Sequence, residues 1–426
     1  MVVRFAIQYY ENSKYAKVVN RNPRREVGTI TGKPVIVSAV RTPIGRFGGS
    51  LAQFTAPQLA AIAVKEAVAR AGIEGELVDE VIFGNVLKAG LGQNPARQAA
   101  IYGGLPVKVG AFTVEKVCGS GMKSIMLAGQ AIRAGDADCI VAGGMESMSN
   151  APYLLPKARF GYRLFDGEIK DELVMDGLWD AYGDFHMGHT GDWIAKKYDI
   201  SREEQDRFAL SSHQKAIKAI DEGAFRTEIV PIEIPQKKGD PILMDTDEGP
   251  RRDTSYEKLA RLKPFFNEDG TVTAGNASAI NDVAAAVIVM SEEKSTELGI
   301  KPLARIVDQQ WSGVEPIAAM TGPIEAIRTI LERQNLTIDD IDLFEENEAF
   351  ASQTLAICKE FDIPLERTNV HGGAVALGHP IGASGTRIVV TLINAMQRYG
   401  KRRGLAALCI GGGNGTAMLM EREEDW

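Results

Sequence analysis

The sequence predicts an α/β fold that contains two similar halves. Short runs of β-branched and apolar residues alternate with longer segments of helical periodicity, which is the pattern of a layered α/β domain. The same order of segments occurs near both ends of the chain, and the spacing agrees: Asn85 to Cys118 is 33 positions and Asn347 to His379 is 32. This match indicates two copies of one fold packed together. The alternative is a coincidence of the strand patterns that α/β proteins share.

The first copy begins at Pro34 with VIVSAV, a β-branched run typical of a buried strand. After the turn RTPIGRFGGS, the amphipathic segment PQLAAIAVKEAVARAG predicts a helix that ends at Gly72. The later elements follow in the order of a strand over VDEVIFGNV, a helix around NPARQAAIYGG, a strand over AFTVEKV, a helix from Cys118 or just after it, and a strand over DCIVAGGMESM.

The second copy repeats this order. Pro302 opens the strand LARIVDQQWSG, and the helix IEAIRTILERQN follows it. IDDIDLFEENEAF corresponds to VDEVIFGNV, the turn with His379 corresponds to the turn with Cys118, and GLAALCIGGGNGTAMLM corresponds to DCIVAGGMESM. Because the packing of two such copies places equivalent helix starts close together, we expect Cys118 and His379 to meet across 261 positions of sequence.

Between the halves, a segment of roughly residues 150–275 is rich in charge, proline, glycine and aromatic residues. Insertions of this kind often cover a substrate site. The predicted organisation is therefore an N-terminal extension over residues 1–33, a first half over 34–299 that contains the insertion, and a second half over 302–426.

Composition excludes several classes of function. The net charge of −8 gives no global case for nucleic-acid binding. No stretch reaches the roughly 18 apolar residues of a membrane span. The four cysteines are far apart and form no Cys-x-x-Cys pair, which argues against a zinc knuckle or a disulfide framework and favours a reducing compartment. We expect a cytoplasmic protein.

The alternative location is an organelle reached through N-terminal targeting. Residues 1–33 are basic, but they carry Glu11 and Glu26 and little serine, which favours a plain extension over a transit peptide.

Three residues in glycine-rich turns suggest covalent acyl transfer. Cys118 stands at the predicted start of a helix, where backbone N–H groups and the helix dipole favour a thiolate. His379 in GHPIGASG would complete a thiol–imidazole pair, and a second thiol, Cys409, suits proton transfer. The alternative for Cys118 is a buried structural cysteine. The turn around His379 lacks the Gly-Lys-Ser/Thr ending of a phosphate-binding P-loop.

Asn347 in EENEAFA is a polar amide at a strand end. It suits the binding of a water molecule or a carbonyl oxygen, and it also suits the N-cap of the following helix.

Nearly everything from Pro34 to Glu421 resembles the thiolase family. The matching stretches are VCGSGMKS, GGMESMS, HMGHTG, VTAGNASAINDVAAA, NEAFA, NVHGGAVALGHPIGASG and CIGGGNGTA. The resemblance implies a thiolase fold, a five-layer αβαβα arrangement of two duplicated halves with a loop domain inserted in the first. It also implies a homotetramer, a dimer of dimers that uses the inserted segment.

The resemblance assigns roles to the candidate residues. Cys118 matches the nucleophile that takes the acyl group from coenzyme A, His379 the base that activates it, and Cys409 the acid/base thiol. Asn347 matches the residue that holds a water beside the histidine in one oxyanion hole. The N–H groups of Cys118 and Gly411 would form a second hole, where negative charge develops in the reaction.

Coenzyme A contacts follow from the same resemblance. Ser278 in GNAS matches a serine that contacts pantetheine, and Arg251 falls at a basic position near the nucleotide. A solvated surface charge is the alternative for Arg251. The residues that match the lining of the pantetheine and acyl pocket are Leu178, His186, Met187, Met320 and Phe350.

The implied reaction is the reversible condensation of two acetyl-CoA to acetoacetyl-CoA and CoA, an acyl transfer of lipid and fatty acid metabolism that needs no metal or redox cofactor. His186 and Met187 in FHMG favour this short-chain chemistry. The alternative is a degradative 3-ketoacyl-CoA thiolase with longer substrates, because pocket volume discriminates chain length only modestly.

Two more distant readings are disfavoured. Decarboxylating ketosynthases pair the cysteine with two histidines, whereas Cys409 occupies the last position here. A non-enzymatic scaffold would be expected to lose Cys118, His379 or Cys409, and all three are present.

Overall fold

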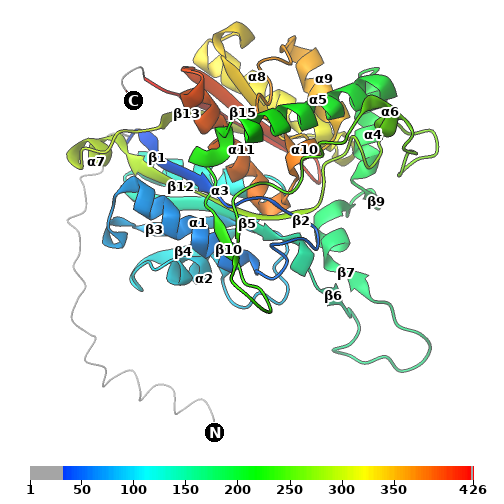
Figure 1. Ribbon diagram of the computed structural model, residues 1–426, viewed down its shortest axis with the longest axis horizontal. Helices are drawn as coiled ribbons and strands as arrows, with labels where there is room; N and C mark the ends of the chain where they lie inside the picture. The colour runs from blue at the N-terminus through cyan, green and yellow to red at the C-terminus, as the bar shows by residue number, and fades with distance from the viewer. Residues whose placement is uncertain (1–31, 424–425) are drawn as a thin grey trace.

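The computed structural model describes residues 32–423 and 426, and its body is a stack of helical and sheet layers (Figure 1). The first half follows the predicted order closely. Its elements are β1 (Pro34–Arg41), β2 (Gly45–Arg46), α1 (Ala56–Ala71), η1 (Gly75–Leu77), β3 (Glu80–Gly84), α2 (Pro95–Tyr102), β4 (Gly110–Val114), α3 (Ser120–Ala134), β5 (Cys139–Ser147), β12 (Asn281–Ser291) and α7 (Glu292–Glu297). Helix α1 ends at Gly72 in a left-handed conformation, as predicted.

The second half repeats this plan. Its elements are β13 (Ala304–Gly313), η5 (Pro316–Thr321), α8 (Gly322–Gln334), η6 (Ile338–Asp340), β14 (Leu343–Glu346), α9 (Ala351–Phe361), α10 (Ala374–Leu377), α11 (Ile381–Arg398), β15 (Arg403–Ile410) and β16 (Asn414–Glu421). Helix α11 follows the turn of His379 as α3 follows the turn of Cys118.

One predicted correspondence needs correction, because GLAALCIGGGNGTAMLM is a hairpin of two strands. β15 and β16 pair antiparallel up to Ile410 and Asn414, and three glycines join them. Gly412 and Gly413 have φ of 77° and 86°, a backbone conformation that glycine adopts without steric cost. The counterpart in the first half is the antiparallel pair β5 and β12, so the long insertion occupies the place of this short turn.

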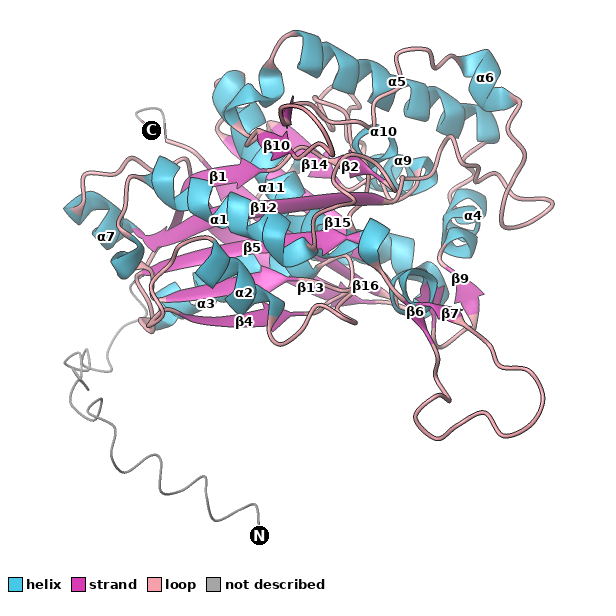
Figure 2. Cartoon of the chain, turned by 60° about the horizontal axis from the view of Figure 1, so that its bottom comes forward, coloured by secondary structure: helices cyan, strands magenta, loops and turns pink. Residues whose placement is uncertain are grey.

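The strands of the two halves form one sheet in the order β14-β15-β16-β13-β1-β12-β5-β3-β4, and β2 pairs with β12 beside this path. In the described part of the chain, β1 and β13 join the two halves of this order through the pairs Val35–Arg305 and Ile36–Ala304. Helices α3 and α11 contact each other and pack between the half-sheets around a core that includes Met122, Ile125 and Ile388. Helices α1 and α2 cover the outer face of the first half-sheet (Figure 2). Helices α8 and α9 cover that of the second. The predicted αβαβα layering is confirmed.

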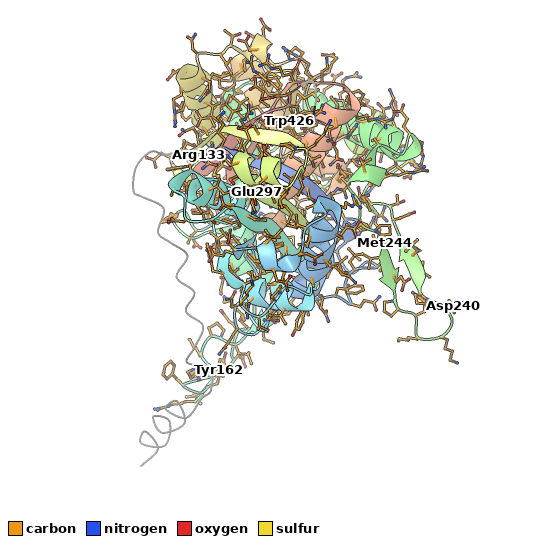
Figure 3. All side chains as sticks on the ribbon, turned by 90° about the vertical axis from the view of Figure 1, so that its left-hand side faces the viewer. Arg133, Tyr162, Asp240, Met244, Glu297 and Trp426 are labelled. Atoms are coloured by element: carbon orange, nitrogen blue, oxygen red, sulfur yellow. The ribbon has the colours of Figure 1, made fainter. Side chains whose placement is uncertain are left out.

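The insertion between β5 and β12 runs along one side of this body. Its elements are η2 (Met148–Asn150), β6 (Tyr153–Leu154), β7 (Lys170–Asp171), η3 (Leu173–Leu178), β8 (Trp179–Asp180), β9 (Phe185–His186), α4 (Gly188–Lys197), α5 (Arg202–Asp221), η4 (Ala224–Thr227), β10 (Ile232–Ile234), β11 (Ile242–Met244) and α6 (Tyr256–Ala260). Two of its segments project from the body, and Tyr162 and Asp240 mark them in Figure 3.

A fully buried arginine ties the insertion to β1. The Arg41 guanidinium donates to Glu228 Oε1 at 2.6 Å and to both carboxylate oxygens of Asp247 at 2.7 and 2.9 Å. The side chains of all three residues are inaccessible to solvent. This bridge holds the insertion in a defined place over the end of the sheet.

The extension predicted for residues 1–33 lies outside the described residues except for Gly32 and Lys33, and the domain boundaries stay a prediction. Among the described helices, none has the length and apolar character that crossing a membrane requires.

Candidate active site

A cavity of about 290 Å³ lies where the loops of the two halves meet the insertion. It brings together residues from all three parts of the chain. The lining includes most of the predicted site residues, namely Cys118, Leu178, His186, Met187, Ser278, Met320, Phe350, His379, Cys409 and Gly411. The expectation that Cys118 and His379 meet is therefore correct.

Backbone hydrogen bonds join the loops that form the cavity wall. The N–H of His379 donates to the carbonyl of Ala279 at 3.0 Å. The N–H of Ser278 donates to the carbonyl of Ala349, also at 3.0 Å. The GNAS, NEAF and GHPIG stretches are thereby held to one another, so the positions of their side chains are set by the backbone rather than by loop packing alone.

Cys118 lies two residues before α3 and lines the cavity. Burial raises its pKa to about 11, although the backbone N–H groups of Gly411 and of Cys118 itself favour the thiolate and lower the pKa. The prediction that the N–H groups stabilise a resting thiolate is therefore wrong. The loss of hydration on burial raises the pKa of Cys118 by more than the N–H groups lower it. Cys118 is a thiol at rest and needs a base to react.

His379 is a neutral base whose tautomer is set by Ser384. Ser384 Oγ donates its single proton to the carbonyl of Pro380 at 2.9 Å and lies 2.6 Å from His379 Nδ1. A hydroxyl that donates to a carbonyl accepts from the ring, so we assign the hydrogen to Nδ1 and the lone pair to Nε2. Burial, with a contribution from the charge of Arg387, lowers the pKa of His379 to about 3.

Asn347 sits beside His379 behind the cavity wall. Its Nδ2 lies 3.3 Å from Nδ1 and 3.5 Å from Nε2 of the imidazole. Its backbone N–H donates to the carbonyl of Ala407 in β15 at 3.0 Å, which anchors the NEAF loop to the sheet. Helix α9 begins at Ala351 with Phe350 as its N-cap, so the alternative reading of Asn347 as the N-cap is wrong.

Cys409 is the buried thiol near the end of β15. Burial raises its pKa well above the ordinary value, and the negative charges that Cys118 and Glu346 would carry raise it further. Two negative sulfurs in this apolar cavity would repel each other. At most one of Cys118 and Cys409 is therefore expected to be a thiolate at any time.

The insertion supplies an aromatic wall that was only partly predicted. His186 stacks on Phe266 with ring centroids 4.7 Å apart and an interplanar angle of 18°. The N–H of Gly188 donates to His186 Nδ1 at 3.1 Å, which orients the ring. Phe266 itself was not predicted, since nothing in LKPFFNEDG marks it apart from an ordinary exposed aromatic.

Other lining residues were also missed. Their own side chains carry no reactive group, and they are Met148, Gly177, Phe265, Thr273, Ala274, Ala277, Ala279, Ile280, Ala349 and Ile381. Ser384 was missed as well, although its place five residues after His379 in a Gly-Ala stretch could have drawn attention to it.

Arg251, like Asn347, is a predicted site residue that does not line the cavity. Its side chain is exposed, and its backbone N–H donates to His213 Nδ1 at 3.2 Å. A contact between Arg251 and the nucleotide of coenzyme A stays a prediction.

Comparison with known proteins places the chain in a family. The model of the thiolase N-terminal domain matches residues 34–293, and that of the thiolase C-terminal domain matches residues 300–422. A curated acetyl-CoA acetyltransferase of Pseudomonas aeruginosa is 54% identical, with 91% of this chain and 99% of that protein covered. One of Syntrophomonas wolfei is also 54% identical, covering 92% and 100%. A probable acetyl-CoA acyltransferase of Staphylococcus epidermidis is 50% identical, covering 92% and 99%.

Among solved structures, the crystal structure of the Bacillus anthracis acetyl-CoA acetyltransferase matches with a TM-score of 0.90 and 46% identity, covering 92% of this chain and 100% of that one. The protein belongs to the thiolase family.

Proposed function

We propose that this protein is an acetyl-CoA C-acetyltransferase that catalyses the reversible condensation of two acetyl-CoA to acetoacetyl-CoA and CoA. The observation that carries the proposal is the meeting of Cys118, His379 and Cys409 in one apolar cavity. The names of the relatives described above support the substrate.

The first half-reaction is acylation of Cys118. His379 Nε2 takes the proton of the thiol, and the sulfur attacks the thioester carbonyl of acetyl-CoA. The tetrahedral oxyanion accepts hydrogen bonds from the N–H groups of Cys118 and Gly411, which are directed at this sulfur. The bond between the carbonyl carbon and the CoA sulfur then breaks, which leaves an acetyl group on Cys118.

The departing CoA sulfur takes the proton of Cys409. This transfer solves a problem posed by the resting state, since Cys409 is a thiol and cannot act as a base until it loses that proton. After it, CoA leaves as a thiol, Cys409 is a thiolate, and His379 carries the proton from Cys118.

The second half-reaction forms the carbon–carbon bond. Cys409 removes an α-proton from a second acetyl-CoA, and protonated His379, together with a water held by Asn347, stabilises the enolate oxygen. The carbanion attacks the acetyl carbonyl, Cys118 leaves, and His379 returns its proton to the Cys118 sulfur. All three groups regain their starting protonation, and the scheme requires no metal ion or redox cofactor.

A degradative 3-ketoacyl-CoA thiolase with longer substrates is the second candidate. The stacked His186 and Phe266, with Met187 and Met320, are bulky side chains that line the same cavity as the Cys118 sulfur and so reduce the room for a longer acyl chain. This crowding favours the short chain.

A series of kcat/KM values for CoA-dependent cleavage of 3-ketoacyl-CoA substrates tests the choice. We expect the four-carbon substrate to be preferred. The value of kcat/KM should fall by about 10-fold or more for each lengthening of the acyl chain that brings it against His186 and Phe266. Turnover of eight- to sixteen-carbon substrates without turnover of acetoacetyl-CoA would instead support the degradative enzyme. Absence of turnover with any of them would revive the scaffold reading.

We also propose a homotetramer, a dimer of dimers, located in the cytoplasm and acting in lipid and fatty acid metabolism. The projecting β6–β7 segment supports the tetramer, because it exposes a series of large apolar side chains (Figure 3). They are Tyr153, Leu155, Phe160, Tyr162, Leu164, Phe165 and Ile169. The location is supported by the free state of all four cysteines, which suits a reducing compartment.

A further inference from the structure

The residue before the nucleophile has an unusual backbone conformation. Val117 has φ of 45°, and in the described part of the chain it is the one β-branched residue with a positive φ. A branched Cβ clashes with the backbone in this region, so such a residue is a true outlier. Conformations of this kind persist only where the surroundings impose them, and they concentrate at functional sites.

Hydrogen bonds hold both peptide groups of Val117. Its N–H donates to Glu115 Oε1 at 2.7 Å. Its carbonyl accepts from the N–H of Ser120 at 3.0 Å and from the Ser120 hydroxyl at 2.7 Å. The strained turn is therefore fixed on both sides of the residue, and the next N–H along the chain is that of Cys118.

The side chain of Val117 faces the turn that carries the second N–H donor. A Cβ placed on Gly411 would lie 3.4 Å from Val117 Cγ1 and 3.4 Å from Met187 Sδ, so these are the two side-chain atoms that face this side of Gly411. The neighbouring residues Gly119 and Ile410 are also close, because a Cβ on Gly119 would overlap Ile410 Cδ1. Lys116 Nζ adds a polar link, 3.3 Å from Asn414 Oδ1.

We infer that Val117 is a positioning residue whose strained conformation and packed γ-methyl group set the separation of the Cys118 and Gly411 N–H groups. These two groups come from opposite halves of the chain, and no backbone hydrogen bond between described residues joins one directly to the other. Their spacing therefore depends on the packing of the residues beside them. The inference rests on the proposed acyl transfer at Cys118.

The test compares two reactions of the same sulfur. Acetylation passes through an oxyanion that needs both N–H groups, whereas alkylation by iodoacetamide forms no oxyanion at a carbonyl. Val117→Gly removes both the strain and the methyl contact. We expect acetylation of this variant to slow by about 100-fold, since displacement of a catalytic group by about 1 Å has an effect of that size. Alkylation should change by less than about threefold.

Stability separates positioning from general damage. Release of the positive φ should leave the thermal unfolding midpoint of Val117→Gly at or above that of the wild type. Val117→Thr keeps a branched Cβ with a γ-methyl group, and we expect it to recover most of the acetylation rate. The matched control is Asp362→Gly at the C-cap of α9, where φ is 54°; its midpoint should also hold or rise, with acetylation unchanged.

Two acyl donors, acetyl-CoA and p-nitrophenyl acetate, distinguish this inference from the proposed function. Wild-type protein that accepts an acetyl group from p-nitrophenyl acetate alone would contradict the proposed function, and the variant comparison with that ester would still decide the role of Val117. Failure with both donors would overturn both. Normal acetylation of Val117→Gly, or equal losses of acetylation, alkylation and stability, would overturn the positioning role.

Discussion

The reactive side chains of this site are all neutral at rest, and this is a property of the cavity rather than of any one residue. Burial raises the pKa of Cys118 to about 11 and lowers that of His379 to about 3. In an apolar enclosure the neutral form of each group is favoured. Charged forms therefore arise only when a proton moves between neighbouring groups, at the time when the carbonyl of the substrate can accept negative charge.

Ser384→Ala tests the tautomer of His379. Loss of the hydroxyl removes the acceptor for Nδ1–H, so the proton can move to Nε2 and remove the lone pair that accepts the thiol proton. We expect the acetylation rate of Cys118 to fall by about tenfold, which is the effect of one hydrogen bond of about 1–1.5 kcal/mol. ¹⁵N shifts of histidine-labelled protein should show a mixture of tautomers at this residue.

The control for Ser384 is Ser295→Ala. Ser295 is also buried and its hydroxyl donates to the carbonyl of Ile300 at 2.6 Å, but it lies in α7. This variant should keep the full acetylation rate. If Ser384→Ala acetylates normally with an unchanged histidine spectrum, the tautomer assignment is wrong.

The dependence of the acetylation rate on pH at acidic values gives an independent measure of the pKa of His379. A base with a pKa lowered to about 3 stays unprotonated as the pH falls through 6.5, the ordinary value for histidine. We therefore expect the single-turnover acetylation rate to show no inflection near pH 6.5, where an exposed histidine would lose activity by protonation. An inflection near that value would show that His379 is hydrated in the working enzyme.

At this scale the sequence could predict the reactive groups but not their supports. Cys118, His379 and Cys409 stand out because each lies in a glycine-rich turn, a context that exposes a side chain to a pocket. Phe266 acts through His186, which is 80 positions away in the sequence, so no local pattern marks it. Ser384 lies only five positions after His379, but the sequence alone does not show that the turn brings its hydroxyl to the imidazole. The net pKa of Cys118 was also unpredictable, because it depends on burial that only the packed halves produce.

At the scale of elements, the stretch GLAALCIGGGNGTAMLM was predicted as the counterpart of a single strand, but it forms the two strands of the hairpin β15 and β16. Apolar residues run through both arms, and the glycines between them resemble the end of a single buried strand in periodicity alone. The first half uses the same antiparallel pair, β5 and β12, but opens the turn to admit the insertion. The predicted duplication therefore gave the correct order of elements but did not separate β16 from β15.

Arg41→Met tests how the insertion is held. The substitution leaves Glu228 and Asp247 buried without their cation, so we expect a loss of about 3–5 kcal/mol in the free energy of unfolding. Urea denaturation followed by circular dichroism measures this loss. The control is Arg207→Met, which removes an exposed ion pair with Glu203 and should leave the urea midpoint unchanged. Equal, small effects of the two substitutions would show that the buried bridge does not anchor the insertion.

At the scale of the whole molecule, duplication is what creates the site. Helices α3 and α11 are neighbours in the central layer, so the turns that precede them bring Cys118 and His379 together. The matched spacing of the two halves made this meeting predictable from sequence. The shape of the insertion was not predictable in the same way, because it has no counterpart in the second half and much of it is irregular.

The projecting β6–β7 segment tests the proposed assembly. We expect the wild type to be a tetramer in light scattering coupled to size-exclusion chromatography. Replacement of residues 156–168 by Asn-Gly, a favoured two-residue hairpin turn, should yield dimers that still acetylate Cys118. The control shortens the other projection, between β10 and β11, and should leave the tetramer intact. A wild-type dimer, or a shortened variant that stays tetrameric, would contradict the proposal.

The most direct test of the account is the intact-protein mass after mixing with acetyl-CoA, followed by mapping of the modified peptide. We predict one acetyl group on Cys118 in the wild type, none in Cys118→Ala, and a persistent acetyl group on Cys118 in Cys409→Ser, which acylates but condenses very slowly. An acetyl group on Cys409, turnover by Cys118→Ala, or normal condensation by Cys409→Ser would contradict the separate roles of the two thiols.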